Sequence, residues 1–450
     1  MALASISLRG FRNLEPTSVD FAEGSNYLFG PNGAGKTNLL EAIHYLAIGR
    51  SFRRCPDAEL LGFGRDVLVV SGKDESGERA EIRFDGREKR ILRNDIPVDK
   101  LSEYFGWLPV VVLLLEDIEL VKGAPGIRRS FLDMAISKAE GGDKSKAKSP
   151  EPRANGKGRT KLEARSESLE ARMAETEGEG RTARGGMRDE EKSYIALIAG
   201  YRRAVSQYNR LLERSAVSRE PLADLAAWEE ELVLSGVPVY ESRLAKVGEL
   251  LENAVKHYER LAGHGAMFSY RSSVENIGTR SESSKDSVMS LADAFRQRLA
   301  ATRERARALG HALVGPHRDD IRIARGDREL RKFGSVGEQR LAGIALRLAE
   351  ADMILSAGRQ RPVFLLDEVA SELDEQRSRM VLAMVAERGQ MVYAAARRMQ
   401  DSRIRGFKDS SDADSCRDSS VSLDPSNPGP LDSFGGKEFH VEAGKVSELS

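Results

Sequence analysis

The sequence predicts an α/β fold built around a phosphate-binding loop. Residues 27–29 form a short apolar run typical of a buried strand, and apolar residues recur at helical spacing over residues 39–47. A glycine-rich loop, residues 30–37, separates the two. Far along the chain, a second apolar strand over residues 363–366 ends in two carboxylates. In α/β sheets, ligands bind at the carboxyl ends of the strands, so these observations predict a site where both segments meet.

The loop fits the P-loop pattern G-x-x-x-x-G-K-[ST]. A strand, a glycine loop and a helix start direct backbone N–H groups and the positive end of the helix toward one spot, which suits a polyphosphate. Lys36 would reach the β- and γ-phosphates, and the Thr37 hydroxyl would bind Mg²⁺. A glycine-rich turn before an ordinary helix is the simpler alternative, which the flanking pattern disfavours. The candidate nucleotide-binding residues are Gly30, Pro31, Asn32, Gly33, Ala34, Gly35, Lys36 and Thr37.

The second apolar strand supplies the carboxylates that a P-loop requires. Asp367 would bind Mg²⁺ through its water shell, and Glu368 would act as general base toward the attacking water. An apolar strand followed by Asp-Glu is a weak signal alone. It gains weight here because it follows a P-loop in the same chain. The candidate catalytic residues are therefore Lys36, Asp367 and Glu368, and the candidate metal ligands are Thr37 and Asp367.

Composition sets limits on partners and location. At 450 residues the chain can hold two or three domains, and 70 basic against 70 acidic residues give no net charge. Any nucleic-acid surface must therefore be a local patch. Two cysteines far apart, Cys55 and Cys416, suit a reducing compartment and argue against a zinc site. No signal peptide is evident, and the longest apolar run, residues 108–115, is too short to span a membrane.

The remaining elements are expected from apolar periodicity and turn residues. Three polar segments, residues 139–192, 271–287 and 401–436, are too poor in aliphatic side chains to repay the entropy of ordering. Expected strands are residues 3–8, 17–21, 67–71, 80–84, 89–92, 110–115, 321–323, 329–332, 390–393, 438–441 and 445–449, and expected helical regions are residues 194–261, 291–309 and 341–355.

Two basic segments have two interpretations each. Residues 49–54, G-R-S-F-R-R, could contact phosphate or could be a solvated helix end. In the helix over residues 291–309, Arg296, Arg303 and Arg307 lie seven and eleven residues apart and hence on one face. Such a stripe could follow a DNA backbone, although a solvated face is the commoner explanation.

The order of the motifs resembles an ABC-type ATPase head of the group that holds the SMC proteins, the zinc-hook repair ATPases and the RecF family. The finer match is to the RecF family of recombination mediators. No long coiled coil and no C-x-x-C hook is present, which separates the chain from the other two. The matching blocks are G-F-R-N-L (10–14), the P-loop helix (30–43), G-R-S-F-R (49–53), E-D-I-E-L-V-K-G (116–123), R-R-x-F-L-D (128–133), G-P-H-R-D-D (315–320), G-E-Q-R (337–340) and L-L-D-E-V-A-S-E-L-D (365–374).

The resemblance implies a fold, a domain order and a site shared between subunits. The fold would be an α/β ABC-type head, with a mixed sheet and flanking antiparallel strands, plus a short helical arm. Ser335, Gly337 and Gln339 would form the signature that caps the γ-phosphate of the other subunit, and Asp374 would lie at the dimer seam. The implied parts are 1–138 (N-terminal half of the head), 139–192 (disordered insertion), 193–310 (helical arm with the polar insertion 271–287), 311–400 (C-terminal half with signature, Walker B and D-loop), 401–436 (disordered insertion) and 437–450 (closing hairpin).

The resemblance also implies a function in recombinational DNA repair and replication, within the SOS response to DNA damage. The protein would be a cytoplasmic ATP- and Mg²⁺-dependent DNA-binding protein. ATP would drive a homodimer that clamps double-stranded DNA near single-strand/double-strand junctions and aids recombinase loading with mediators of the RecR and RecO type. Weak DNA-stimulated hydrolysis would act as a release timer. No membrane association is expected.

Several features depart from the pattern or leave alternatives open. Leu114 and Leu115 stand where the RecF block usually has Ser-Pro, and residues 394–396 are alanines where related heads place hydroxyls or a histidine. His317 and Arg318 have either a structural or a nucleotide- or DNA-linked role. The alternative functions are an SMC-like or overcoming-lysogenization-type ATPase in DNA end processing or phage defence, and a non-hydrolysing ATP-gated scaffold.

Overall fold

The computed structural model describes residues 2–98, 104, 106–141, 193–218, 225–274, 290–369, 373–396 and 436–449. These residues belong to one compact unit, formed by Met1–Gly142 and Ser193–Ser450. Most of the three polar segments expected at 139–192, 271–287 and 401–436 lies outside the described residues, as do Ser371 and Glu372. Helix α4 extends to Glu140, two residues into the first of these segments. Within the described ranges, no helix combines the length and apolarity needed to cross a membrane.

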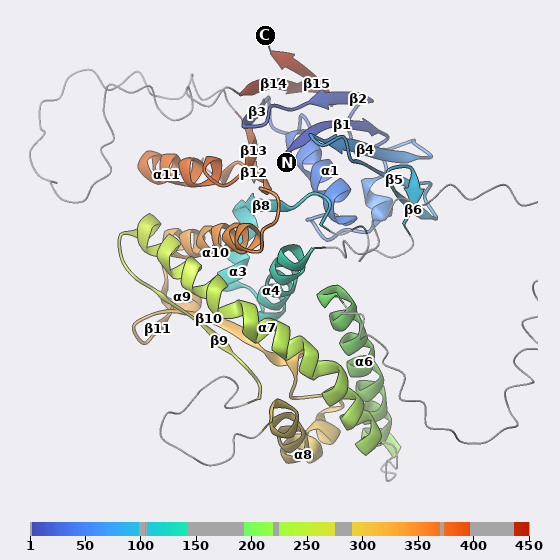
Figure 1. The fold of residues 1–450 in the computed structure, drawn as a ribbon, viewed down its shortest axis with the longest axis vertical. Coiled ribbons are helices and arrows are strands. Elements are labelled where there is room, and N and C mark those ends of the chain that lie inside the picture. Colours follow the sequence, from blue (N-terminus) through green and yellow to red (C-terminus); the bar gives the residue numbers. More distant parts are fainter. Residues whose placement is uncertain are drawn as a thin grey trace, which may run out of the picture. The chain divides into compact units, whose positions relative to one another are not determined.

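A six-stranded mixed sheet forms the centre of the fold (Figure 1). Neighbouring strands of this sheet are parallel, with one exception. The two strands at the C-terminal end of the chain pair antiparallel and form the closing hairpin expected from the sequence. The parallel register places Asp367 opposite Ala394 on one side and Leu114 on the other. The strands, in sheet order, are β15 (Lys445–Leu449), β14 (Lys437–Glu442), β3 (Ser25–Phe29), β13 (Gln390–Ala395), β12 (Val363–Asp367) and β8 (Val110–Leu114).

A second, antiparallel sheet covers one side of the P-loop helix. The strands expected at residues 3–8 and 17–21 precede the P-loop strand in the chain but belong to this sheet, and not to the central one. Helix α1 (Lys36–Ile48) contacts strands of both sheets, and its side chains share one core with them. The strands, in sheet order, are β2 (Thr17–Asp20), β1 (Leu3–Arg9), β4 (Leu68–Asp74), β5 (Arg79–Phe84), β6 (Lys89–Arg93) and β7 (Ile96–Pro97).

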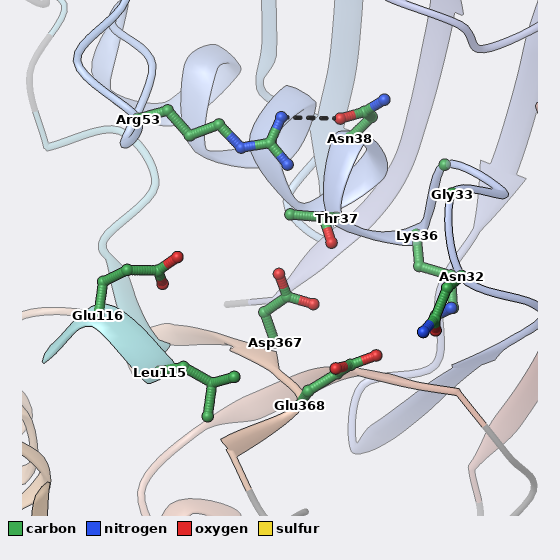
Figure 2. A pocket seen from close by; sticks show the side chains of 11 residues that line it. Asn32, Gly33, Lys36, Thr37, Asn38, Arg53, Leu115, Glu116, Asp367 and Glu368 are labelled. Carbon is green, nitrogen blue, oxygen red and sulfur yellow. Dashed lines mark hydrogen bonds between the residues drawn. The ribbon is translucent and has the colours of Figure 1, made fainter.

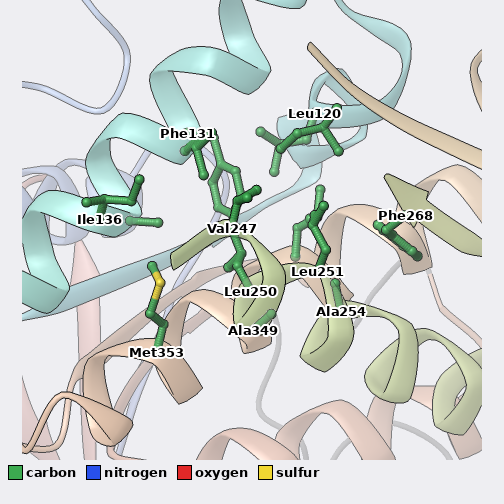
Figure 3. Close-up of a cluster of buried hydrophobic side chains, with 14 of the residues drawn as sticks. Leu120, Phe131, Ile136, Val247, Leu250, Leu251, Ala254, Phe268, Ala349 and Met353 are labelled. Atoms are coloured by element: carbon green, nitrogen blue, oxygen red, sulfur yellow. The ribbon is translucent and has the colours of Figure 1, made fainter. Parts of the chain in front are cut away.

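Helices cover the opposite face of the central sheet and continue into the arm. Helix α7 packs against α10, α6 and α8, so that the arm and the head share one hydrophobic core (Figure 3). Phe131, Leu250 and Met353, from three different helices, meet in this core. The elements are η1 (Asp57–Leu60), η2 (Leu115–Ile118), α3 (Glu119–Lys122), α4 (Pro125–Glu140), α6 (Tyr194–Ser218), α7 (Leu225–Ala262), α8 (Leu291–Leu309), η5 (Pro316–Arg318), α9 (Leu330–Phe333), α10 (Val336–Ser356) and α11 (Glu375–Ala386).

One expected strand is wrong in part. The chain forms a hairpin of β10 (Asp320–Arg325) and β11 (Arg328–Glu329), which joins β9 (Met267–Arg271) in a three-stranded sheet, but residues 330–332 are helical. The short helix α9 buries Leu330, which is 2% exposed, and leaves Phe333 in solvent. The helical turn places Leu330 in the core that the head and the arm share.

A buried arginine joins the head to the arm. Arg243 of α7 is 2% exposed and pairs with Asp133 of α4 at 2.7 Å and with Asp319 at 3.1 Å. Its guanidinium also donates to the carbonyl of Pro316 at 2.6 Å, and the hydroxyl of Tyr194 donates to Asp133 at 2.8 Å. The two carboxylates therefore share one buried cation, and a charge in a low-dielectric interior is costly without such a partner.

Replacement of Arg243 should cost much more stability than replacement of a surface arginine with the same partner. Arg243→Ala removes the buried cation that both carboxylates share, so we expect a loss of about 3–5 kcal/mol in the free energy of unfolding. Arg202 is the matched control, since it also contacts Asp133, at 3.4 Å, but is 62% exposed. Arg202→Ala should cost less than about 1 kcal/mol. Urea denaturation of both variants measures the difference, and equal losses would contradict a buried hub.

Candidate functional site

The loop between β3 and α1 is fixed by close backbone contacts. Gly30 has φ 153°, and a Cβ at this position would lie 1.9 Å from the carbonyl oxygen of Val441 in β14. Gly35, the residue before α1, has φ 117° and a Cβ there would lie 2.8 Å from Leu14. The carbonyl of Val441 excludes a Cβ at Gly30, and the positive φ favours glycine at both positions. The first N–H groups of α1 therefore remain available at the N-terminal end of the helix, where the helix dipole favours anions.

Lys36 is held against the loop that precedes it. Its side chain is buried, and the ammonium donates to the carbonyl oxygens of Gly30 at 2.7 Å and Pro31 at 3.0 Å. Burial lowers the pKa of Lys36, and the nearby carboxylates of Glu368 and Asp367 oppose this shift. The cation therefore lies between the loop backbone and the acidic pair Asp367–Glu368.

The two carboxylates follow β12 at the same edge of the sheet. Burial raises the pKa of Asp367, a hydrogen bond with Thr37 lowers it, and the charge of Glu368 raises it. Glu368 has a φ of 51°, a left-handed conformation that is uncommon for a side chain with a Cβ. Its backbone N–H donates to the carbonyl of Ala394 at 3.0 Å, which anchors this turn to β13.

The loop and the carboxylates line one cavity of about 340 Å³ (Figure 2). Asp367 lies below Thr37, with Glu116 and Glu368 on either side of it. Three lining residues, Asn38, Leu115 and Glu116, were not among the candidates taken from the sequence, and Arg53 was expected only as part of the basic segment 49–54. The complete lining is Asn32, Gly33, Gly35, Lys36, Thr37, Asn38, Arg53, Leu115, Glu116, Asp367 and Glu368.

Arg53 belongs to the basic segment 49–54 and is positioned by a buried glutamate. Glu41 of α1 is fully buried and accepts hydrogen bonds from Arg12 at 2.5 Å, Ser51 at 2.5 Å and Arg53 at 3.1 Å. Arg53 also donates to the side chain of Asn38 at 3.0 Å. The segment therefore directs one of its arginines to the rim of the cavity. This arrangement agrees with the phosphate-contact interpretation of the segment.

Glu116 could have been found from the sheet register. Strand β8 runs parallel to β12, and Leu114 pairs with Asp367, so the residue two positions after Leu114 lies beyond the same sheet edge as the acidic pair. Leu115, which stands in place of a Ser-Pro element, also lines the cavity. The pairing of these strands is a tertiary feature that local sequence patterns do not contain. The third carboxylate at the site, Glu116, was therefore not predicted.

The expected signature lies elsewhere. Ser335 caps the N-terminus of α10 and accepts a hydrogen bond from the Glu338 N–H, while Glu338 accepts from the Ser335 N–H at 2.8 Å. Gln339 is buried and donates to the carbonyl of Leu330 at 2.7 Å, and Asp374 caps α11. The cavity formed by the described residues is not lined by Ser335, Gly337, Gln339 or Asp374. A role for these four in the same subunit's cavity is therefore not indicated, and their role toward a second subunit stays a prediction.

The basic stripe on α8 faces other helices. Arg296 pairs with Glu230 at 2.6 Å and Arg303 pairs with Glu229 at 2.5 Å, both on α7. Arg307 donates to Ser215 of α6 at 3.2 Å. Carboxylates of the neighbouring helix already pair with two of the three cations, which disfavours the interpretation of this stripe as a free DNA-binding face.

His317 and Arg318 take part in the junction between head and arm. The Tyr201 hydroxyl lies 2.6 Å from Nδ1 of His317, and Arg318 donates to the carbonyl of Ala312 at 2.6 and 2.8 Å. Neither side chain lines the cavity. Burial lowers the pKa of His317 to about 4, and the charges of Arg318 and Arg129 act in the same direction. The geometry favours the structural interpretation of both residues.

The fold combines a central mixed sheet with an antiparallel lobe, and the P-loop faces the Asp-Glu pair across one cavity. Together these features define an ABC-type ATPase head. Residues 5–215 match a family model described as an AAA domain. The chain is 31% identical to the DNA replication and repair protein RecF of Geobacillus kaustophilus over 87% of this chain and 91% of that one. Against RecF of Moorella thermoacetica the identity is 31%, over 86% and 87% of the two chains. The chain therefore belongs to the RecF family of DNA replication and repair proteins.

A solved structure has the same fold. The recombination mediator protein RecF with ATP, described as part of the RecFOR pathway, superimposes with a TM-score of 0.72 at 23% identity. The match covers all of this chain and 98% of that one. It confirms the predicted α/β head with its helical arm as one fold.

Protonation of His317 should destabilise the protein in mild acid. Its pKa is about 4 in the folded state against an ordinary 6.5, so between these values the unfolded chain binds more protons and stability falls as pH falls. We expect about 1–2 kcal/mol of the stability lost between pH 7 and pH 5 to come from this group. His317→Gln should remove that part of the pH dependence in urea denaturation. Parallel curves for the variant and the wild type would exclude this origin.

Proposed function

We propose that this chain binds ATP and Mg²⁺ in the cavity and uses them to form a homodimer that holds duplex DNA near single-strand gaps. The observation that carries the proposal is the cavity itself. It brings a P-loop lysine and threonine against two carboxylates that follow them by more than 300 residues. A polyphosphate with a divalent cation is the ligand class that such a donor set accommodates.

Each residue has a proposed task. Lys36 would exchange its contacts with the carbonyls of Gly30 and Pro31 for the β- and γ-phosphates, while the N–H groups at the start of α1 bind the same phosphates. Thr37 and Asp367 would hold Mg²⁺, whose charge offsets that of the phosphates and keeps Asp367 ionised despite its burial. Arg53, held by Glu41 and Asn38, would add a second cation at the rim.

Glu368 would act as the general base. It lies beside Asp367 at the cavity, and its left-handed backbone is fixed by the hydrogen bond to Ala394. A strained conformation that the surroundings enforce is often found where a side chain must take one direction. Glu368 would accept the proton of the attacking water, and the alanines at 394 and 395, which have no hydrogen-bonding side chain, agree with slow turnover.

The signature would act on a second copy of the chain. Ser335 lies at the N-terminal end of α10, an end that favours an anion, but this end does not line the cavity of its own subunit. A phosphate bound at one subunit's cavity would therefore be capped by Ser335, Gly337 and Gln339 of the other, with Asp374 at the seam. Such an arrangement makes ATP the link between two heads, and hydrolysis would release it.

The DNA-related part of the proposal is supported by the family. The relatives bear the name DNA replication and repair protein, and the solved structure is named a recombination mediator in the RecFOR pathway. By extension, this chain would work in the cytoplasm with mediators of the RecR and RecO type and aid recombinase loading at single-strand/double-strand junctions. DNA-stimulated hydrolysis would set the time for which the duplex is held.

Two substitutions should separate nucleotide binding from turnover. Lys36→Ala removes a charged donor to phosphate, so ATP affinity should fall about 10- to 100-fold in calorimetry. Glu368→Gln keeps the shape of the site and removes the base. It should lower turnover by about 10²–10⁴-fold while the ATP-bound dimer persists in sedimentation. Normal turnover in Glu368→Gln would exclude the proposed base, and unchanged ATP affinity in Lys36→Ala would exclude the proposed site.

A mixing experiment tests the shared site. Ser335→Arg blocks the signature, and Lys36→Ala disables the P-loop, so each variant alone should be inactive. In an equal mixture, half of the dimers are mixed, and each mixed dimer pairs one intact P-loop with one intact signature. About a quarter of wild-type turnover should therefore return on mixing. No recovery, with both variants shown to be folded by circular dichroism, would contradict a site formed between subunits.

A further inference from the structure

The segment after η1 presents one aromatic ring to solvent. Phe63 has a relative exposure of 105%, the highest of any large apolar residue that the structure describes. The ring lies in a four-residue turn closed by a hydrogen bond from the Arg65 N–H to the carbonyl of Gly62 at 3.0 Å. Gly64, within the turn, has a φ of 66°. The ring thus projects from a defined turn and not from an irregular end of the chain.

The base of this turn is tightly fixed. Gly62 donates to the carbonyl of Gly10 at 2.9 Å, and Arg12 donates to that of Leu60 at 2.7 Å, on either side of the bridge between Phe11 and Leu61. A Cβ at Gly62 would lie 2.6 Å from the carbonyl oxygen of Arg12. Phe11 and Leu60 are fully buried. The turn therefore combines a rigid base with an exposed tip, which lowers the entropy lost when the ring contacts a ligand.

Hydrogen bonds link the base of the turn to the wall of the cavity. Asn13, which follows Arg12, donates to the carbonyl of Gly33 at 3.2 Å and accepts from the side chain of Asn38 at 2.7 Å. Gly33 and Asn38 both line the cavity. A short series of hydrogen bonds thus connects the wall of the proposed nucleotide site to the chain segment that supports Phe63.

The surroundings of the ring indicate what it binds. In the described part of this segment, only Val67, 42% exposed, is another exposed large apolar residue, whereas protein interfaces require contiguous apolar patches of several hundred Å². The nearby charges have both signs: Arg65 lies 3.9 Å from Glu15, and Asp66 and Glu59 are exposed. A single ring in an environment of mixed charge suits an uncharged planar group better than a phosphate or a protein surface.

We propose that Phe63 stacks on a nucleobase. The inference rests on the proposed function, because the base belongs either to the nucleotide in the cavity or to an unpaired position in the DNA that the protein holds. Both sources present the same chemistry, a flat heteroaromatic ring. Stacking on an aromatic side chain tolerates any base and adds affinity without hydrogen bonds that read sequence.

The test places a fluorescent reporter at the turn. Phe63→Trp keeps an aromatic ring. Of the two native tryptophans, Trp107 is buried and Trp228 is partly buried, so the signal is the difference from the wild type, and stacking at position 63 should quench that added fluorescence. The ligands are ATP with Mg²⁺, inorganic tripolyphosphate with Mg²⁺, a duplex with a single-stranded tail, and the same duplex with blunt ends. Leu234→Trp, on the exposed face of α7 at 62% exposure, is the matched control for quenching unrelated to stacking.

Quenching by ATP but not by tripolyphosphate assigns the base to the nucleotide, and quenching by the tailed but not the blunt duplex assigns it to DNA. Phe63→Ala and Phe63→Leu should both weaken that ligand about tenfold, because leucine keeps the apolar surface but loses the π-face. Thermal unfolding of both variants should match the wild type.

Binding of ATP and tailed duplex with no quenching, and with wild-type affinity in Phe63→Ala, overturns the inference and leaves the proposed function intact. Quenching only on self-association at high protein concentration also overturns it, because the ring would then belong to a protein contact. If the wild type binds no ATP, the proposed function fails, while the tailed duplex still decides whether Phe63 stacks on a base.

Discussion

The parallel pairing of β3 with β13, and of β13 with β12, is the constraint on which the rest of the structure depends. It aligns the C-terminal ends of strands that are more than 300 residues apart, so that the P-loop and the Asp367–Glu368 pair emerge at one edge. Such a sheet must be covered on both faces. The antiparallel lobe with α1 forms one cover, and the helices of head and arm form the other. The arm is thereby part of the core that positions the site, and is not an appendage.

Ion pairs between distant elements extend this constraint to α10. Arg347 of α10 donates to Asp117 at 2.8 Å, and Glu350 of the same helix pairs with Lys138 of α4 at 2.5 Å. Asp117 directly follows Glu116, which lines the cavity. A Cβ at Gly343 would lie 2.6 Å from the carbonyl oxygen of Asp117, so α10 packs against this segment as closely as glycine permits. A shift of the cavity wall and a shift of α10 are consequently not independent events.

The sequence predicted the elements that local patterns define. The helix Leu291–Leu309 agrees at both ends, because Ser290 caps its first turn and Gly310 adopts the left-handed conformation that ends it. The P-loop residues and the Asp-Glu pair were likewise found from local spacing. Features that depend on tertiary contacts were not. Glu116 required the pairing of β8 with β12, and helical spacing placed Arg296 and Arg303 on one face without revealing that α7 carries acids opposite them. The short helix that buries Leu330 was missed for the same reason.

Glu368 illustrates a conflict between durability and activity. A left-handed backbone at a residue with a Cβ costs about 1–2 kcal/mol, which glycine or asparagine would largely relieve. Selection for thermostability alone would therefore favour replacing the residue that the proposed chemistry needs. A consensus or directed-evolution programme on this chain would have to hold position 368 fixed, or its most heat-resistant products would be inactive. The free-energy cost of the left-handed backbone at this turn stays in the protein, because optimisation of the remaining residues cannot remove it.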